Sequence, residues 1–121
     1  MATALARRRV EPDPKTSNEE QSDEDLIETY LRGEKSESQE AFRALVVRHG
    51  PKVLGICRRV LDLHQDAEDA FQATFLVLAR KAATIRNRRV LAGWLYEVAH
   101  RIAVKVRGHK GRRRNLERQA A

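Results

Sequence analysis

Four histidines, one cysteine and a group of clustered carboxylates are the side chains of this 121-residue chain that could catalyse a reaction or bind a metal. The histidines stand at positions 49, 64, 100 and 109, and none are paired at the spacing of a zinc-binding helix. Cys57 has no second thiol nearby, and its apolar surroundings in the sequence predict a buried thiol. His64 lies near Asp66, Glu68 and Asp69, but an acidic helix start explains these carboxylates without a metal. We therefore expect a protein that is not an enzyme and that has no metal site and no cofactor.

The charge of the chain changes from acidic to basic along its length. Residues 1–38 carry 6 basic and 10 acidic side chains, whereas residues 81–121 carry 12 basic and 2 acidic ones, within a net charge of +7. Positive charge concentrated at one end is typical of proteins that bind a polyanion, most often nucleic acid. A basic tail that serves solubility, or that binds RNA without specificity, is the alternative interpretation.

The sequence shows no sign of a membrane-spanning segment or of a secretory signal. The chain has no stretch of about eighteen apolar residues, which a membrane-spanning helix requires. Arginines 7 to 9 are not followed by the apolar segment of a secretory signal. We therefore expect a cytoplasmic protein that does not span a membrane.

Composition and periodicity predict an all-α fold, a compact bundle of about four helices formed by residues 22–114. Residues 1–21 lack periodicity and predict a disordered leader. Residues 115–121 predict a tail or the start of a linker. The first helix is expected to begin after Ser22, as its N-cap, and to stop at Gly33.

The second helix is expected from Glu40 to Leu61, with Ser36 or Ser38 as its N-cap. Pro51 interrupts this pattern, and it predicts either one kinked helix or two helices that meet there. The turn after it leads to the third helix, which we expect to begin at a capping Asp66. Its three- and four-residue spacing predicts a buried side made of Ala67, Ala70, Phe71, Thr74, Phe75 and Leu78.

The fourth helix is expected to begin near Val90 and to fray after Gly108 into a basic tail. Its core stripe consists of Leu91, Trp94, Leu95, Val98, Ile102 and Val106. The short basic segment TIRNRR connects the third and fourth helices. From residue patterns alone, the outer side of the third helix is either a docking surface or an ordinary solvated face.

Three stretches of the sequence resemble motifs of one bacterial family, in the same order and spacing. HQDAEDAFQATFLVLARKA is similar to the polymerase-docking motif of extracytoplasmic-function (ECF) sigma factors, and AGWLYEVAHRIAVKVRGHKGRRR resembles their promoter-reading helix. FRALVVRHGPKVLGICRRVL is similar to the long helix that precedes these motifs, including its proline. The resemblance covers about Ser22 to Arg114. The longer motif, with Trp94, also resembles planctomycete-type members of the family.

The resemblance implies a sigma factor region 2 domain that binds core RNA polymerase and opens the minus-ten promoter element in transcription initiation. Its polymerase partner would be the clamp helices of the largest subunit, and an anti-sigma factor would be a further partner. Carried over by position, the polymerase-binding residues are Asp66, Asp69, Gln72, Phe75 and Leu76. Phe75 falls on the border, and the buried side of the helix is its alternative position.

The resemblance also implies a DNA-binding surface for the non-template strand. Four of its residues lie in the loop where the family captures a flipped base, namely Arg86, Asn87, Arg88 and Arg89. The others lie on the DNA-facing side of the last helix: His100, Arg101, Lys105, Arg107 and Arg112. Arginines suit phosphates, and the amide suits a base edge.

The sequence departs from the family pattern in three places. Ala73 stands where the family usually has glutamate, and Arg101 and Lys105 replace the more usual asparagine and aspartate. The chain also ends at Ala121, whereas family members continue into a second domain, region 4, that reads the minus-thirty-five element. A fragment, a truncated gene product and a one-domain variant would all give this ending. Two alternatives to a sigma domain follow: a truncated sigma-like protein that docks on polymerase or an anti-sigma factor without initiating, and a generic basic nucleic-acid-binding bundle.

Overall fold

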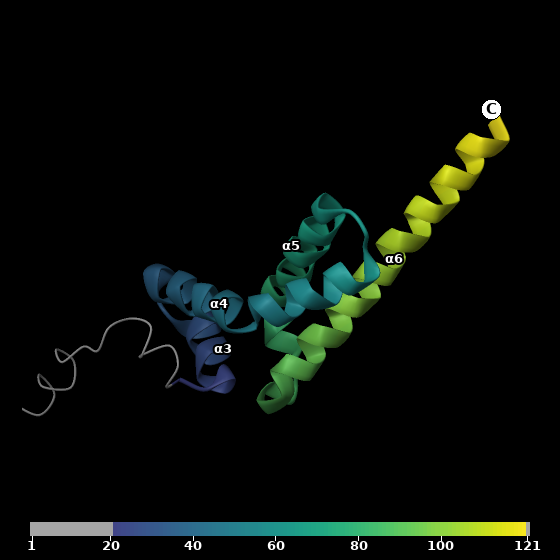
Figure 1. Ribbon diagram of the computed structural model, residues 1–121. Coiled ribbons are helices and arrows are strands. Elements are labelled where there is room, and N and C mark those ends of the chain that lie inside the picture. Colours follow the sequence, from purple (N-terminus) through teal and green to yellow (C-terminus); the bar gives the residue numbers. More distant parts are fainter. Residues whose placement is uncertain (1–20, 121) are drawn as a thin grey trace, which may run out of the picture.

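A computed structural model describes residues 21–120, so residues 1–20 and 121, with nearly all of the expected leader, lie outside the described part. Within that part every regular element is a helix or a 3-10 turn (Figure 1). The elements in chain order are α3 (Asp23–Arg32), α4 (Lys35–Val60), α5 (His64–Lys81), η1 (Ala82–Thr84), η2 (Arg88–Val90) and α6 (Leu91–Ala120). The predicted all-α bundle is confirmed. No helix among the described residues is long and apolar enough to cross a membrane.

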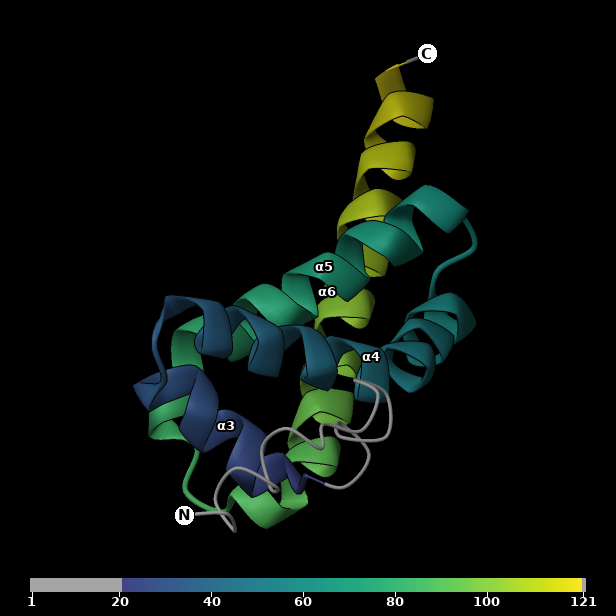
Figure 2. The ribbon, with the colours of Figure 1, turned by 90° about the vertical axis from the view of Figure 1, so that its left-hand side faces the viewer.

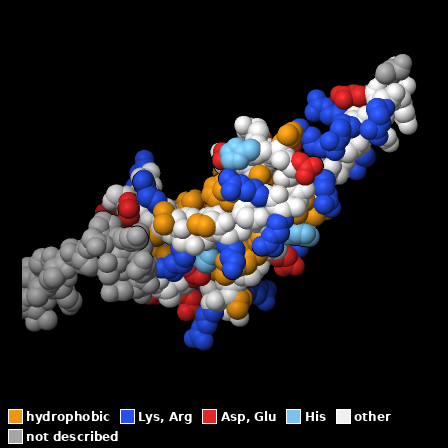
Figure 3. Space-filling view, in the orientation of Figure 1, with side chains coloured by type: hydrophobic (Ala, Val, Ile, Leu, Met, Phe, Trp, Pro, Cys, Tyr) orange, Lys and Arg blue, Asp and Glu red, His pale blue; other side chains and the backbone are white. Residues whose placement is uncertain are grey.

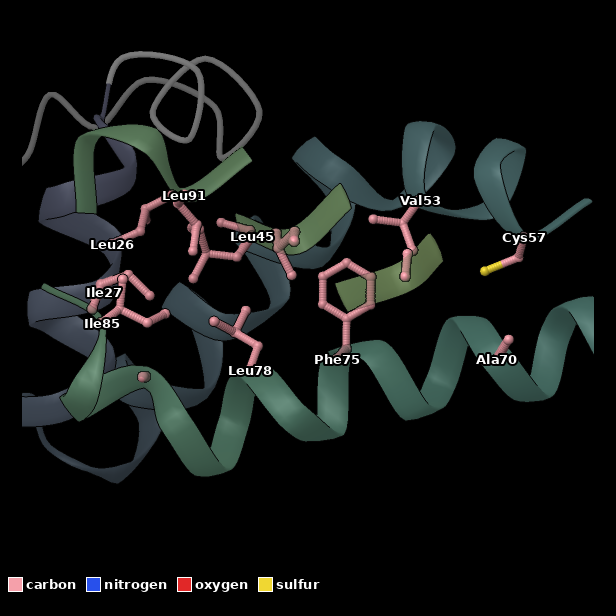
Figure 4. Packing of buried hydrophobic residues seen from close by; sticks show 14 of the residues in the cluster. Leu26, Ile27, Leu45, Val53, Cys57, Ala70, Phe75, Leu78, Ile85 and Leu91 are labelled. Atoms are coloured by element: carbon pink, nitrogen blue, oxygen red, sulfur yellow. The ribbon is translucent and has the colours of Figure 1, made fainter. Parts of the chain in front are cut away.

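The central helix of the bundle is α4, which contacts α3, α5 and α6, while α5 and α6 also contact each other (Figures 1 and 2). Apolar side chains from all four helices form one core. Figure 4 shows Leu26 and Ile27 of α3 gathered with Ile85 and Leu91, close to Leu45 of α4. Burying one such aliphatic side chain contributes about 1.5–3 kcal/mol. The core therefore joins the short α3 and the segment between α5 and α6 to the longer helices.

Helix α3 begins and ends where its sequence predicts. The Ser22 hydroxyl accepts a hydrogen bond from the backbone N–H of Asp25 at 3.0 Å, as an N-cap does. Gly33 follows the last turn, and its N–H donates to the Thr29 carbonyl at 2.7 Å. A Cβ at position 33 would lie 2.7 Å from that same carbonyl oxygen. The glycine is needed for this close approach, since its φ of −74° is ordinary.

Helix α4 begins earlier than expected, and the predicted N-cap at Ser36 or Ser38 is wrong. The N-cap is Glu34, whose N–H donates to Oε1 of Glu37 at 3.2 Å. The Ser38 hydroxyl instead donates to the Tyr30 carbonyl at 2.7 Å, which satisfies a group in the last turn of α3. Pro51 lies within an unbroken helix, so the single-helix alternative is the correct one.

Helices α5 and α6 are both longer than their sequence patterns suggest. Because α5 begins at His64, Asp66 lies in its first turn and is not the expected cap. Helix α6 continues through Gly108 and Gly111 to Ala120, whereas the sequence predicted fraying after Gly108. Figure 1 shows this end of α6 projecting beyond the other helices. The basic tail is thus a helical extension, and the expected boundary at residue 114 falls inside it.

A polar contact fastens the start of α3 to the middle of α4. Oδ1 of Asp23 accepts a hydrogen bond from Nη1 of Arg48 at 2.9 Å and lies 3.0 Å from Nε2 of the buried His49. Burial raises the pKa of Asp23, but the hydrogen bonds and charges of His49 and Arg48 outweigh it and lower that pKa below its ordinary 3.8. The ionised carboxylate therefore stabilises the fold.

The variant Asp23→Asn tests this contribution, because it removes the charge and keeps the shape of the side chain. At pH 7 we expect its free energy of unfolding to be about 1–3 kcal/mol below that of the wild type. As the pH falls below 3.8 the unfolded chain takes up a proton first, so the difference shrinks and is lost below the folded pKa. Urea denaturation at neutral and acidic pH measures this, and an equal difference at both would contradict the assignment.

Candidate functional site

The side of α5 that faces away from the bundle presents a mixed polar and apolar surface. Contacts with α4 and α6 bury the opposite side, which consists of Ala67, Ala70, Thr74, Phe75 and Leu78. Asp69, Gln72 and Leu76 remain exposed, and their three- and four-residue spacing places them on one helical face. Leu76 is 57% exposed and gives this face an apolar side chain. We call these three residues the α5 outer face.

Phe75 belongs to the core, so it takes the buried position that the sequence left open as its alternative. The residue is only 5% exposed. Its ring centroid lies 5.2 Å from that of Phe71 and 6.5 Å from that of Phe42, in edge-to-face geometry. The helical period already placed position 75 with positions 67, 71, 74 and 78, so the sequence contained the signal for this burial.

Asp66 is turned away from the α5 outer face and toward α6. Its Oδ1 lies 3.5 Å from Nζ of Lys110, and its side chain is 13% exposed. Asp69, by contrast, is exposed and accepts a hydrogen bond from Nε2 of Gln65 at 3.1 Å. Of the two carboxylates that the sequence assigned to one docking surface, only Asp69 is available there without breaking an ion pair within the bundle.

The segment between α5 and α6 is an ordered turn held at both ends by buried side chains. Ile85 is 8% exposed and Leu91 is fully buried. Between them, Oδ1 of Asn87 accepts from the N–H of Arg89 at 3.3 Å, and the Asn87 carbonyl accepts from the N–H of Val90 at 3.2 Å. The amide nitrogen of Asn87 remains able to donate to an external acceptor. We call residues 85–90 the recognition loop.

The three arginines of the recognition loop differ in their surroundings. Nη1 of Arg88 donates to Oε1 of Glu28 at 3.1 Å, and Nε of Arg89 lies 3.6 Å from Oε1 of Glu24. Arg86 is exposed. Both acidic partners lie on α3, about sixty residues earlier in the chain, so no short sequence pattern indicates these pairs. Sequence reasoning treated the three arginines as equivalent, and it missed Glu24 and Glu28.

The cations expected on α6 are all exposed, and they form two rows. Arg101, Lys105 and Arg112 are four and seven residues apart on one side of the helix, whereas His100 and Arg107 are seven apart on another. Nη2 of Arg101 lies 3.7 Å from Oε2 of Glu97. Further basic side chains cover the projecting end of the helix (Figure 3). This surface suits the phosphate backbone of a nucleic acid, since Lys and Arg can bind phosphates without contacting a nucleobase.

Nothing in the described part of the chain points to metal or thiol chemistry. Among residues 21–120, no three His, Cys, Asp or Glu side chains are grouped so that they could hold a metal ion. Cys57 is buried, and this burial raises the pKa of its thiol, which stays protonated at neutral pH. The candidate binding sites of the described residues are the exposed surfaces on α5, the recognition loop and α6.

Comparison with known proteins gives two matches. Residues 45–113 match the family model of sigma-70 region 2. The RNA polymerase sigma-H factor of Pseudomonas aeruginosa is 31% identical over 94 residues, which are 78% of this chain and 47% of that protein. The chain thus spans about half the length of the curated relative that it matches. No solved structure matches the chain. The matched residues include α5, the recognition loop and most of α4 and α6, but not α3.

A pair of neighbouring substitutions distinguishes the core of α5 from its outer face. Phe75→Ala should lower the free energy of unfolding by about 3–5 kcal/mol, because it leaves a cavity beside Phe42 and Phe71. Leu76→Ala should change it by no more than about 0.5 kcal/mol, because Leu76 is exposed. Urea denaturation followed by circular dichroism measures both values. Equal losses for the two variants would show that the faces have been misassigned.

Proposed function

Because the chain belongs to the sigma-70 region 2 family, we propose that it is the domain of a sigma factor that binds core RNA polymerase and the unwound minus-ten element of a promoter. The observation that carries the proposal is the presence of two chemically different exposed surfaces on consecutive elements. The α5 outer face combines a carboxylate, an amide and an exposed leucine. The recognition loop and α6 carry arginine, lysine and histidine. Two such surfaces suit two different partners.

The α5 outer face is the proposed polymerase-binding surface. Its partner would be the clamp helices of the largest polymerase subunit, and basic side chains there would meet Asp69 while Gln72 supplies both a donor and an acceptor. Exposed ion pairs contribute little to affinity, so burial of Leu76 should provide much of the binding energy. Asp66 could join this contact only by leaving Lys110. An anti-sigma factor that covers the same face would compete with polymerase.

The recognition loop and α6 are the proposed DNA-binding surface. Exposed cations of α6 would contact phosphates of the non-template strand, while the free amide nitrogen of Asn87 would donate to an acceptor on a base. Holding a base out of the stack costs a few kcal/mol, which these contacts would offset. The mechanism is binding alone, since it makes and breaks no covalent bond.

The finer assignment to the ECF branch is also part of the proposal. It rests on the motifs DAEDAFQATFL and GWLYEVAHRIA, the second of which suggests the planctomycete-type members. Ala73 removes a carboxylate from the region of the α5 outer face, and Arg101 and Lys105 add positive charge to α6. We expect these differences to weaken ionic contacts with polymerase and to strengthen contacts with phosphates.

Substitutions on α5 test the polymerase surface. Asp69→Asn and Gln72→Ala should each weaken binding to a purified clamp-helix fragment about threefold, because the first removes one exposed charge and the second removes an amide that can donate and accept. Glu97→Gln is the control, because it makes the same charge change as Asp69→Asn on α6. Fluorescence anisotropy measures the affinities. Failure of the wild type to bind the fragment would reject this part of the proposal.

The salt dependence of DNA binding tests the loop and α6. On a single-stranded oligonucleotide, Arg86→Gln and Lys105→Gln should each reduce the slope of log affinity against log salt by about 0.7, the loss of one phosphate contact. Arg58→Gln is the matched control, because Arg58 lies beside Phe71 on the side of the bundle between α4 and α5. If all three variants reduce the slope equally, the binding follows net charge and not this surface.

A further inference from the structure

Helix α3 reaches the recognition loop through carboxylates, and we propose that Glu28 is a positioning residue that orders this loop by holding Arg88. The consequence for DNA rests on the proposed function, whereas the ordering of the loop does not. The Arg88 guanidinium donates to Oε1 of Glu28 at 3.1 Å. Oε2 of the same carboxylate lies 2.6 Å from Nε of Arg32, one turn later on α3. Both oxygens of Glu28 are thus engaged by guanidinium groups.

The exposed fractions of the loop arginines distinguish Arg88, which α3 holds, from Arg86 and Arg89, which are available to DNA. The side chain of Arg88 is 24% exposed, whereas that of Arg89 is 80% exposed and its ion pair with Glu24 is longer, at 3.6 Å. A phosphate can therefore replace Glu24 at Arg89 at small cost, because exposed ion pairs are weak. Replacing Glu28 at Arg88 would break the shorter contact, at the more buried of the two arginine side chains. Arg88 acts on the loop, and Arg86 and Arg89 act on DNA.

The place of Arg88 in the loop makes its side chain an effective anchor. Arg88 is the first residue of η2, directly after Asn87, whose side chain caps that turn. Apolar contacts hold only the two ends of the loop: Leu26 and Ile27 of α3 lie close to Leu91 and Ile85 (Figure 4). Two polar contacts attach the middle of the loop to α3, and Glu28–Arg88 is the shorter of them. It fixes the direction in which Asn87 presents its amide nitrogen.

Helix α3 lies outside the residues that match the family model, which begin at position 45. The base preference of the recognition loop would thus depend on a helix that precedes the residues matched by the family model. Because Glu28 is half exposed, its ion pair should contribute little to the stability of the whole bundle. A change at Glu28 should therefore alter the loop and leave the fold intact.

The test compares Glu28→Gln with Glu97→Gln, which makes the same charge change at a glutamate paired with Arg101 on α6. Backbone nitrogen relaxation and amide chemical shifts of residues 85–91 report the order of the loop without any DNA. Anisotropy with single-stranded oligonucleotides that differ at one base reports base preference, as the ratio of the best to the worst affinity. Thermal unfolding confirms that both variants are folded.

We expect Glu28→Gln to shift the amide resonances of the loop, to increase its mobility and to reduce the affinity ratio about fivefold, the effect of one partly exposed ion pair. Glu97→Gln should do none of these. In an Arg88→Gln background, Glu28→Gln should have no further effect on the loop, because the two residues act as a pair. A loop that is unchanged in Glu28→Gln overturns the proposal. If the wild type shows no base preference, the proposed promoter-reading function is wrong. The relaxation data would still decide whether Glu28 orders the loop.

Discussion

The packing of α5 against α4 and α6 determines which of its residues are buried and which are exposed. A helix in contact with two others must turn one apolar side inward, and in α5 that side contains Phe75 and Leu78. The same rotation leaves Asp69, Gln72 and Leu76 outside. It also turns Asp66 toward Lys110. One helix orientation thus leaves three of the five expected residues on the exposed side of α5 and turns Asp66 and Phe75 toward other helices.

The charged side chains form a second layer of organisation around this core. Helix α3 carries carboxylates that contact α4 through Asp23 and the recognition loop through Glu24 and Glu28. The acidic α3 and the basic loop arginines, which look like separate features in the sequence, therefore meet in the folded bundle. Their contact leaves α6 as the more freely exposed basic surface, and it makes the loop a structured element with a defined shape.

Local patterns in the sequence were sufficient for much of the fold. Helical periodicity identified the buried side of α5, and Ser22 and Gly33 marked the ends of α3, because these features depend on residues within one or two turns. In α6 the expected stripe was correct at Leu91 and Leu95 but missed the buried Ala99 and Ala103, while Trp94, Val98, Ile102 and Val106 are only partly buried. The helical extension past Gly108 was missed, since glycine disfavours helix by about 1 kcal/mol and the arginine-rich segment resembled a tail. The contacts of Glu28 with Arg88 and of Asp66 with Lys110 were beyond prediction, because they join residues far apart in the sequence. The docking role of the outer side of α5 is a prediction from family resemblance, and Phe75, one of the residues it includes, is buried in the core.

Photo-crosslinking in a complex of this chain with core polymerase and a promoter bubble tests the division between the two surfaces most directly. A benzoylphenylalanine placed at position 76, on the α5 outer face, should crosslink to the largest polymerase subunit and not to DNA. The same residue placed at position 86, in the recognition loop, should crosslink to the non-template strand and not to the subunit. Exchange of the two targets, or crosslinking of both positions to the same partner, would contradict the proposal that α5 binds polymerase and the loop binds melted DNA.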